Sequence, residues 1–335
     1  MHVAAAAPVR YDAEFYVITK AWMKNILIEF ILVYSVILYF GCSKNPITAG
    51  NPAIWAQVKI GVQSNLVRSL AAYNGTIYAG SDSGVFRSTN SGESWSAINN
   101  GITGRYVNAL AVSGQKLFAG MDGGIFLSTN SGTNWSTIDS GLTNPYISSI
   151  AVSGTNILAG TSGGGVFLST NGGTTWTAIN SGLKWLFVLS VAFSGPNLLA
   201  GTNGDGVYLS SNMGTSWTAV DIGLTANIAI KCFANSGANL FAGTSGGVFL
   251  STNNGMNWKK TGSDTLNFDV NTFALSGANL FAGTNGKGVF HSTDLGTNWT
   301  AIGSGLTYPY VSSLVVSGTN LYAGTYEGGV WRFPL

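Results

Sequence analysis

An eight-residue motif that recurs at a fixed interval constrains the fold more than any other feature of the sequence. This octapeptide, Ser-x-Asn-x-Gly-x-x-Trp, reads STNSGESW at 88–95 and STNGGTTW at 169–176. Six copies occur, and their tryptophans are 40 residues apart once and 41 residues apart four times. Trp55 lies 40 residues before the first of these tryptophans and begins the same phase without the motif. A fixed period of this length indicates a chain built from equivalent units that pack against their neighbours.

A second marker, an Ala-Gly pair, recurs in parallel and marks seven units. It occurs first at 79–80 and last at 323–324. Within the unit at 106–138, apolar alternation and Gly, Asn and Ser punctuation predict four strands, VNALAVSG, KLFAG, IFLST and NWSTI. A period near 40 with several strands per unit is typical of propeller blades rather than of helical arrays. We therefore predict an all-β fold, a seven-bladed β-propeller of four-stranded antiparallel blades.

The two ends of the repeat region predict how the ring closes. The last unit, 311–335, contains three predicted strands and stops before a fourth. The segment 54–58, which reads IWAQV, matches a fourth strand such as NWSTI. We expect the N-terminal strand around Trp55 to complete the C-terminal blade beside Trp331, because this arrangement leaves no exposed sheet edge. The predicted propeller spans 54–335.

Each residue type in the octapeptide has a structural role. Asn or Asp accepts hydrogen bonds from nearby backbone amides, Gly adopts backbone angles that other residues resist, and Trp buries apolar surface between blades. The motif resembles the Asp box, or BNR repeat, of sialidases, sortilin-type receptors and photosystem II assembly-factor propellers. Five of the six copies carry Asn where that family has Asp. The resemblance implies the fold but not a function, since the family hosts many. The structural positions are Asn90, Gly92, Trp95, Asn130, Trp135, Asn171, Trp176, Asn212, Trp217, Asn253, Trp258, Asp294 and Trp299.

The N-terminal region predicts export from the cytoplasm. Residues 26–40 form an apolar run preceded by Lys24, as in a signal peptide. The run ends at Gly41-Cys42, which resembles a bacterial lipobox and implies lipidation of Cys42. We assign 23–42 as a signal peptide; an ordinary secretion signal and an uncleaved anchor are the alternatives. Acyl chains on this cysteine would tether a folded domain to a bilayer, so we expect no other membrane contact.

The remaining N-terminal segments carry no recognisable chemistry. Residues 1–22 place acidic side chains ahead of the apolar run, which suggests a non-native upstream extension or a disordered tail. Residues 43–53 are a short linker. The sequence therefore predicts a bacterial cell-envelope lipoprotein or an extracellular protein.

Composition excludes several function classes. Charged residues make up 8% of the chain and the formal net charge is +2, so we expect no nucleic-acid partner. The only histidines are His2 and His291, which leaves no His-based triad and no zinc cluster. His291 takes a third-strand position, and Cys232 reads as a small buried side chain. We expect no metal, no cofactor and a monomer.

The candidate binding residues lie on one face of the predicted ring. In a four-stranded meander, alternate turns lie on opposite faces. The octapeptides share a face with the turns between first and second strands. The other face, here called the loop face, has the loops before the first strands and those between second and third strands. Arg68 and Lys231 occupy matching positions early in their first strands. Charges concentrate around blades seven, one and two, at Arg68, Asp82, Arg105, Asp122 and Glu327, with Tyr106 and Tyr326 beside them.

Two interpretations of the loop face remain open, besides simple solvation of surface loops. The favoured one is a non-catalytic binding or scaffold role, in which a polar and aromatic pocket recognises a protein or glycan. The alternative is a glycoside hydrolase. A sialidase-like site needs an arginine clamp, a tyrosine with a glutamate partner and an acid/base aspartate. The residues available for it are Arg68, Arg105, Tyr326, Glu327 and Asp82, and Asp82 with Asp122 could form a carboxylate pair. The Arg-Ile-Pro segment typical of sialidases is absent.

Overall fold

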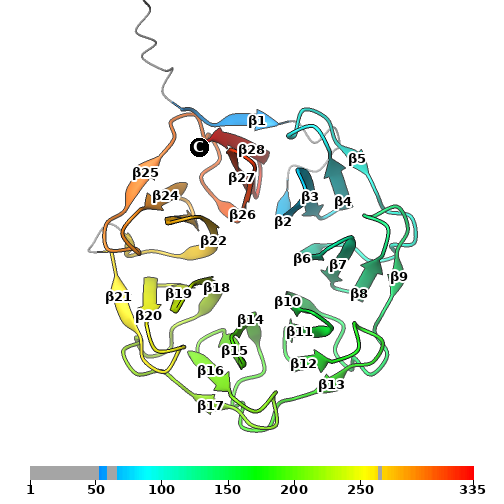
Figure 1. The fold of residues 1–335 in the computed structure, drawn as a ribbon, viewed down its shortest axis with the longest axis vertical. Coiled ribbons are helices and arrows are strands. Elements are labelled where there is room, and N and C mark those ends of the chain that lie inside the picture. Colours follow the sequence, from blue (N-terminus) through cyan, green and yellow to red (C-terminus); the bar gives the residue numbers. More distant parts are fainter. Residues whose placement is uncertain (1–52, 59–65, 263–265) are drawn as a thin grey trace, which may run out of the picture. The chain divides into compact units, whose positions relative to one another are not determined.

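The computed structural model describes residues 53–58, 66–262 and 266–335. The predicted extension, the signal peptide with Cys42 and all but the last residue of the linker lie outside these ranges. Within them every named element is a strand, and no helix is long and apolar enough to cross a membrane. Seven four-stranded antiparallel sheets surround a common centre (Figure 1), which confirms the predicted seven-bladed propeller.

Each blade runs from an innermost strand to a short outermost one. The innermost strands have seven residues each, because their alternate side chains face the centre and the next sheet: β2 (Val67–Tyr73), β6 (Val107–Ser113), β10 (Ile147–Ser153), β14 (Val188–Ser194), β18 (Ile230–Ser236), β22 (Val270–Ser276) and β26 (Val311–Ser317). The second strands follow after tight turns: β3 (Thr76–Ser81), β7 (Lys116–Met121), β11 (Asn156–Thr161), β15 (Asn197–Thr202), β19 (Asn239–Thr244), β23 (Asn279–Thr284) and β27 (Asn320–Thr325). These second strands carry the Ala-Gly pairs and are the most deeply buried part of each blade.

The third and fourth strands form the outer part of each blade. The third strands are β4 (Gly84–Ser88), β8 (Gly124–Ser128), β12 (Gly165–Ser169), β16 (Val207–Ser210), β20 (Gly247–Ser251), β24 (Val289–Ser292) and β28 (Gly329–Pro334). The fourth strands are β5 (Ser96–Ala97), β9 (Ser136–Thr137), β13 (Thr177–Ala178), β17 (Thr218–Ala219), β21 (Lys259–Thr261), β25 (Thr300–Ile302) and β1 (Ala56–Val58). The predicted fourth strand, NWSTI, is longer than the observed strand β9. The strand begins only after the tryptophan, because the Trp135 amide donates to the Asn100 carbonyl of the preceding blade (2.9 Å).

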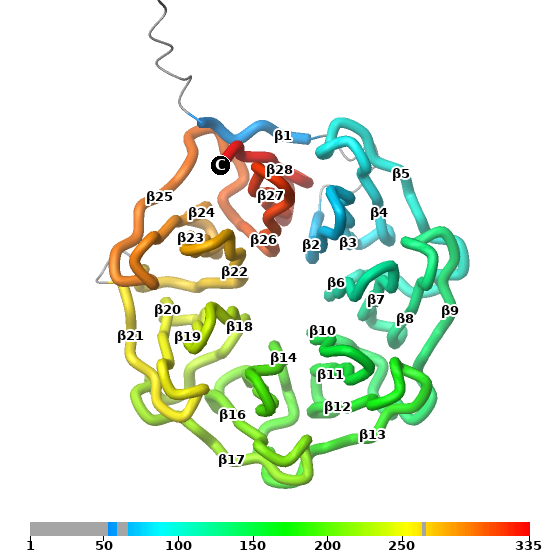
Figure 2. Tube along the Cα trace, viewed as in Figure 1, coloured from blue at the N-terminus to red at the C-terminus, as the bar shows by residue number. Residues whose placement is uncertain are grey.

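The ring closes through the N-terminal strand, as the sequence predicts. β1 pairs antiparallel with β28, placing Gln57 opposite Trp331 and Val58 opposite Val330. Figure 2 shows β1 running along the outer side of the C-terminal blade. Trp55 Nε1 donates to the Ile302 carbonyl (3.1 Å), so the closing strand is also tied to the neighbouring blade.

The octapeptides build the turns between third and fourth strands and join adjacent blades. In the second blade, Asn130 Oδ1 accepts from the Asn134 amide (2.9 Å), which holds the turn. Trp135 is buried, and its Nε1 donates to the Ile98 carbonyl of the preceding blade (2.6 Å). A tryptophan buries about 200 Å² of mainly apolar surface, worth up to about 5 kcal/mol. In the second to fifth blades this tryptophan fastens the blade to the preceding one. Trp95 and Trp299 instead donate within their own turns, to the carbonyls of Gly92 and Gly296.

Candidate functional site

A β-bulge recurs at the same position in all seven innermost strands. In β2 the pairing with β3 slips between Val67 and Ser69, and the equivalent slip occurs in every other blade. A bulge leaves one residue out of the pairing and re-aims its side chain. The seven bulged residues, here called the cavity ring, are Arg68, Asn108, Ser148, Leu189, Lys231, Asn271 and Ser312.

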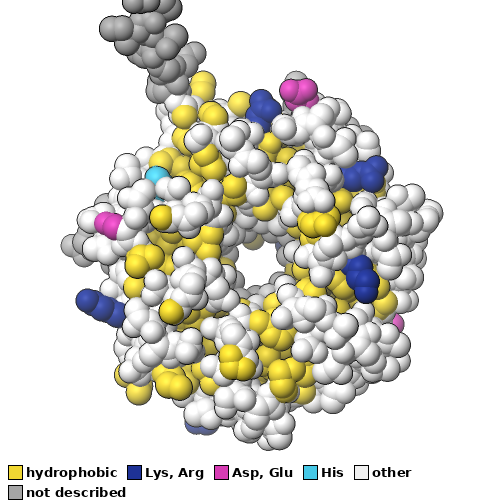
Figure 3. Space-filling view, viewed as in Figure 1, with side chains coloured by type: hydrophobic (Ala, Val, Ile, Leu, Met, Phe, Trp, Pro, Cys, Tyr) yellow, Lys and Arg dark blue, Asp and Glu magenta, His cyan; other side chains and the backbone are white. Residues whose placement is uncertain are grey.

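All seven residues of the cavity ring line one central cavity of about 450 Å³. The space-filling view shows the open centre of the ring (Figure 3), with few charged side chains on the visible face. Because the bulges occur at the start of the innermost strands, the cavity lies toward the loop face. Five further residues complete the lining: Asp122, Tyr146, Ile147, Ser162 and Tyr326.

In four blades the cavity-ring residue joins its blade to the next one. Asn108 Nδ2 donates to the Ile147 carbonyl (3.0 Å), and Asn271 Nδ2 donates to the Val311 carbonyl (3.0 Å). Each accepting carbonyl belongs to the first residue of the next innermost strand. The hydroxyls of Ser148 and Ser312 make the same contact to the carbonyls of Val188 and Val67.

In the other three blades the following residue makes this inter-blade contact instead. Ser69 Oγ donates to the Val107 carbonyl (3.2 Å), and Ser190 Oγ donates to the Ile230 carbonyl (3.0 Å). Cys232 Sγ takes the same role in a longer contact to the Val270 carbonyl (3.9 Å). In these three blades the bulged residue, Arg68, Leu189 or Lys231, does not make this inter-blade hydrogen bond.

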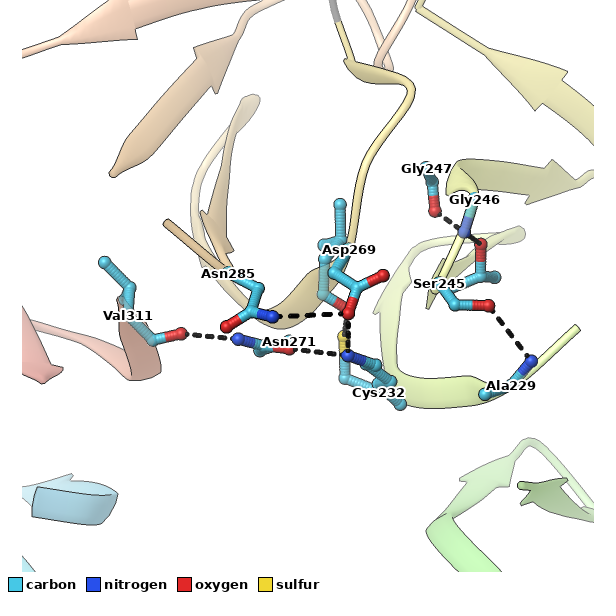
Figure 4. Close-up of polar contacts among 12 residues, drawn as sticks. Ala229, Cys232, Ser245, Gly246, Gly247, Asp269, Asn271, Asn285 and Val311 are labelled. Carbon is cyan, nitrogen blue, oxygen red and sulfur yellow. Dashed lines mark hydrogen bonds and ion pairs between the residues drawn. The ribbon is translucent and has the colours of Figure 1, made fainter. Parts of the chain in front are cut away.

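Lys231 forms a polar network with residues of the next blade. Its Nζ lies 2.6 Å from Asp269 Oδ2 and 3.1 Å from Asn271 Oδ1. Asn285 Nδ2 also approaches Asp269 Oδ2, at 3.4 Å (Figure 4). The Lys231–Asp269 pair is the one ion pair between described residues. The Lys231 charge is therefore neutralised within the protein.

Among the described residues, Arg68 has no such neutralising partner. No carboxylate oxygen of a described residue lies within 4.0 Å of its guanidinium nitrogens. Its Nε is buried and has no hydrogen-bond partner within the described ranges. The guanidinium carbon lies 5.1 Å from the centre of the Tyr106 ring, a cation–π contact. Tyr106 holds this place with a φ of 56°, a left-handed conformation uncommon for a tyrosine.

Exposed aromatic side chains, here called the rim, lie on the loop face, and one of them, Tyr146, lines the cavity. They immediately precede three innermost strands: Tyr146 in the third blade, Phe187 in the fourth and Tyr310 in the seventh, with exposed fractions of 54%, 51% and 52%. Their carbonyls accept from the amides of Ser162 (2.9 Å), Asn203 (2.9 Å) and Tyr326 (3.2 Å). These hydrogen bonds fix the loop backbone, so the rings are displayed on a rigid frame.

The structure brings together four of the seven predicted binding residues. Arg68, Asp122 and Tyr326 line the cavity, and Tyr106 stacks on Arg68. Asp122 Oδ1 accepts from Asn108 Nδ2 (2.8 Å). The remaining three do not line the cavity: Arg105 and Glu327 are exposed, and Asp82 is half-buried.

Sequence reasoning missed most of the cavity ring. It matched Arg68 with Lys231 but overlooked Asn108, Asn271 and the other polar members. The sequence does contain a signal for these residues, because each cavity-ring residue directly follows the apolar residue that begins its innermost strand. Simple alternation conceals it, since a bulge changes the direction of the side chain without changing the pattern.

The other titratable groups offer little for catalysis. Burial raises the pKa of the Cys232 thiol to about 12, which leaves almost no thiolate near neutral pH. Burial, followed by a hydrogen bond to Asp205, raises the pKa of Tyr208 to about 12. His291 Nε2 lies 2.8 Å from Asn279 Oδ1, and burial lowers the pKa of its ring. Among the described residues, no three His, Cys, Asp or Glu side chains gather closely enough to hold a metal ion.

Comparison with known proteins places the chain among β-propellers. Residues 188–306 match a family model described as the DUF6242 beta propeller domain. No curated protein gives a significant match. The family match covers one part of the ring and supports the fold without indicating an activity.

Solved structures extend this likeness to the whole ring. The extracellular domain of the hybrid two-component system BT4673 from B. thetaiotaomicron has a TM-score of 0.71 and 17% identity, covering 84% of this chain and 39% of that one. The GH74 xyloglucanase from Xanthomonas campestris has a TM-score of 0.68 and 18% identity, covering 84% and 53%. YCF48 from Cyanidioschyzon merolae has a TM-score of 0.62 and 18% identity, covering 84% and 99%. The chain thus spans about two fifths of the BT4673 domain, and these likenesses show the fold alone.

Proposed function

We propose that the protein is a non-catalytic binding or scaffold propeller that recognises a protein or glycan through its loop face. The observation that carries the proposal is the central cavity, in which one re-aimed side chain per blade meets a rigid aromatic rim. Concave sites with a few convergent polar groups are typical of binding. The protein acts at the bacterial cell envelope or outside the cell, tethered through lipidated Cys42. The intact mass of the mature N-terminus tests the lipidation.

The rim suits recognition of a large partner. Tyrosine and tryptophan supply broad contact area while losing few rotatable bonds. Because hydrogen bonds already fix the backbone at Tyr146 and Phe187, binding costs little backbone ordering entropy there. The extracellular domains among the similar structures fit a location outside the cytoplasm.

The arrangement of acidic groups favours binding over glycoside hydrolysis. Glycosidases use two carboxyl groups that flank the scissile bond, about 5–9.5 Å apart. Of the three candidates, Asp122 lines the cavity, whereas Asp82 and Glu327 do not. Asp122 is also engaged by the Asn108 amide (2.8 Å). A hydrolytic site would need a second carboxylate on the cavity wall.

Site-specific photo-cross-linking tests the proposed face. In the full-length protein in its source cells, p-benzoylphenylalanine would replace Tyr146 on the loop face or Tyr73 on the opposite face, both of which are exposed. We expect discrete adducts from position 146 alone. Adducts from neither position, or equally from both, would contradict the proposal. Turnover of sialosides or other glycosides that Glu327→Gln abolishes would instead support the hydrolase.

A further inference from the structure

We propose that Arg68 anchors a carboxylate of a peptide segment of the partner at the centre of the loop face. The inference rests on the proposed function and names the chemistry that the cavity recognises. Its starting point is the exchange at the second residue of the innermost strands. Ser69 makes the inter-blade hydrogen bond to Val107 (3.2 Å) that Asn108 and Asn271 make in their own blades. The fold therefore does not need the side chain of Arg68 for blade contact.

Lys231 provides an internal comparison for Arg68. Both residues are cations at the same ring position, and in both blades the next residue has taken over the inter-blade contact. Lys231 is paired with Asp269 at 2.6 Å, whereas Arg68 has no carboxylate partner among the described residues. A cation that lines a cavity without an acidic partner is electrostatically incomplete, and an incoming carboxylate completes it.

The surroundings of Arg68 fit a carboxylate better than a bulky cation or a neutral group. The guanidinium presents several donors in a planar fork that matches the two oxygens of a carboxylate. The Tyr106 ring holds it from one side at 5.1 Å. Asn108 and Ser312, the neighbours of Arg68 on the ring, are neutral, and the Asp122 carboxylate is occupied by Asn108. One monodentate or bidentate carboxylate can therefore bind without displacing an existing ion pair.

The rim indicates that this carboxylate belongs to a peptide. Beside the fourth blade, Trp185, Leu186 and Phe187 are consecutive and all exposed. The Leu186 carbonyl accepts from the amides of Gly163 (3.1 Å) and Gly165 (2.9 Å), which fixes this apolar triplet. A leucine and a phenylalanine offer no hydrogen bonds to sugar hydroxyls, whereas they pack well against apolar side chains. The triplet lies outside the cavity lining, so a peptide that carries apolar residues as well as the acidic one matches a charged cavity with an apolar surface beyond it.

Three variants of the full-length protein isolate the contribution of Arg68. Arg68→Asn installs the residue that β6 and β22 carry at this position, so the ring should fold normally while the cation is lost. Arg68→Lys keeps the charge but removes the planar fork. Arg105→Asn is the matched control, because it removes an exposed arginine of the loop face that does not line the cavity. Circular dichroism and thermal melts verify that each variant folds.

Ligand-observed saturation-transfer NMR then measures binding of defined probes. The probes are acetyl-Phe-Glu-Phe-amide, its Gln counterpart and methyl galacturonide. We expect the Glu peptide to bind in the millimolar range, about 1–10 mM, and the Gln peptide at least about tenfold more weakly. Arg68→Asn should weaken binding of the Glu peptide at least about tenfold, Arg68→Lys less than that, and Arg105→Asn by no more than about threefold.

Several outcomes would overturn the inference. Equal binding of the Glu and Gln peptides, no binding of the Glu peptide, or undiminished binding by a folded Arg68→Asn variant would each exclude an Arg68 carboxylate anchor. Binding of methyl galacturonide without the Glu peptide would assign the cavity to an acidic glycan and overturn the peptide assignment. If cross-linking at position 146 persists in Arg68→Asn, the proposed function stands while this inference fails.

Discussion

The two faces of the ring repeat in different ways. On the octapeptide face the side chains themselves repeat, and the same serine, asparagine and glycine contacts recur in successive turns. On the loop face only the backbone repeats: each innermost strand bulges at its second residue, but the half-buried side chain there is of five different types in the seven blades. Repetition of side chains thus marks the surface that assembles the ring, and repetition of backbone alone marks the surface free to vary.

The inter-blade contact at the cavity shows how this freedom arises. The carbonyl that opens each innermost strand needs a donor from the preceding blade, and two successive positions can supply it. Where the bulged residue is Asn108, it donates itself; where it is Arg68, Ser69 donates instead. A buried carbonyl is satisfied in both cases, so the bulged position can change chemistry without a structural cost.

The largest expected effect is the loss of an octapeptide tryptophan. Trp176 is 4% exposed and its Nε1 donates to the Ile138 carbonyl of the preceding blade (2.5 Å). Trp176→Ala should lower the free energy of unfolding by about 3–5 kcal/mol through the cavity it leaves. The matched loop-face change, Tyr146→Ala, should cost no more than about 0.5 kcal/mol because that side chain is exposed. Denaturant unfolding measures both, and comparable losses would refute the division between the faces.

A smaller loss of stability is expected when alanine replaces a glycine. The loss should be larger where the glycine contacts the neighbouring blade than where it only allows a turn. Gly141 has a φ of 88°, and a Cβ there would lie 2.3 Å from the Trp176 carbonyl oxygen. Gly154, in the turn between β10 and β11, has a φ of 63° and nothing within 4 Å of such a Cβ. Gly141→Ala should therefore cost more than about 2 kcal/mol and Gly154→Ala about 1 kcal/mol. Thermal melts of the two variants check the order, and equal losses would show that the Trp176 contact does not matter.

The sequence predicted the features that repeat as side chains. The seven blades and the pairing of the segment after Trp55 with the strand containing Trp331 follow from the period and from residue types. It did not predict the length of the outermost strands, because the Trp135 amide bonds across blades rather than along its own sheet. Such a contact joins residues distant in sequence and leaves no local signature.

The candidate site was predicted only in part, for a related reason. Charge alone selected Arg68 and Asp122, which line the cavity, but it also selected Arg105 and Glu327, which lie on exposed loops outside the cavity wall. The polar residues that make up most of the ring, such as Asn108, are ordinary strand residues in the sequence. Only the bulge turns them inward, and a bulge is set by pairing with the next strand rather than by the residue itself.

The smallest expected effect tests whether the octapeptides are as interchangeable as their repetition implies. Asp294 is the one acidic member, and hydrogen bonds from the Asn298 amide and side chain lower the pKa of its carboxyl below the usual 3.8. A carboxyl whose pKa falls on folding stabilises the fold above its unfolded value and loses that effect as pH drops through the folded value.

Asp294→Asn makes this turn identical in type to the other five. Wild type should therefore melt slightly higher than the variant near pH 7, and the difference should shrink as the pH falls below 3.8 and vanish once it falls below the lowered pKa of the folded state. The reverse change, Asn171→Asp, should add the same pH-dependent increment, because Asn171 Oδ1 accepts from the Thr175 amide in the equivalent turn (3.0 Å). A difference in Tm that does not change with pH, for either variant, would show that the turn does not sense the charge, and the absence of any difference would show that asparagine and aspartate hold it equally.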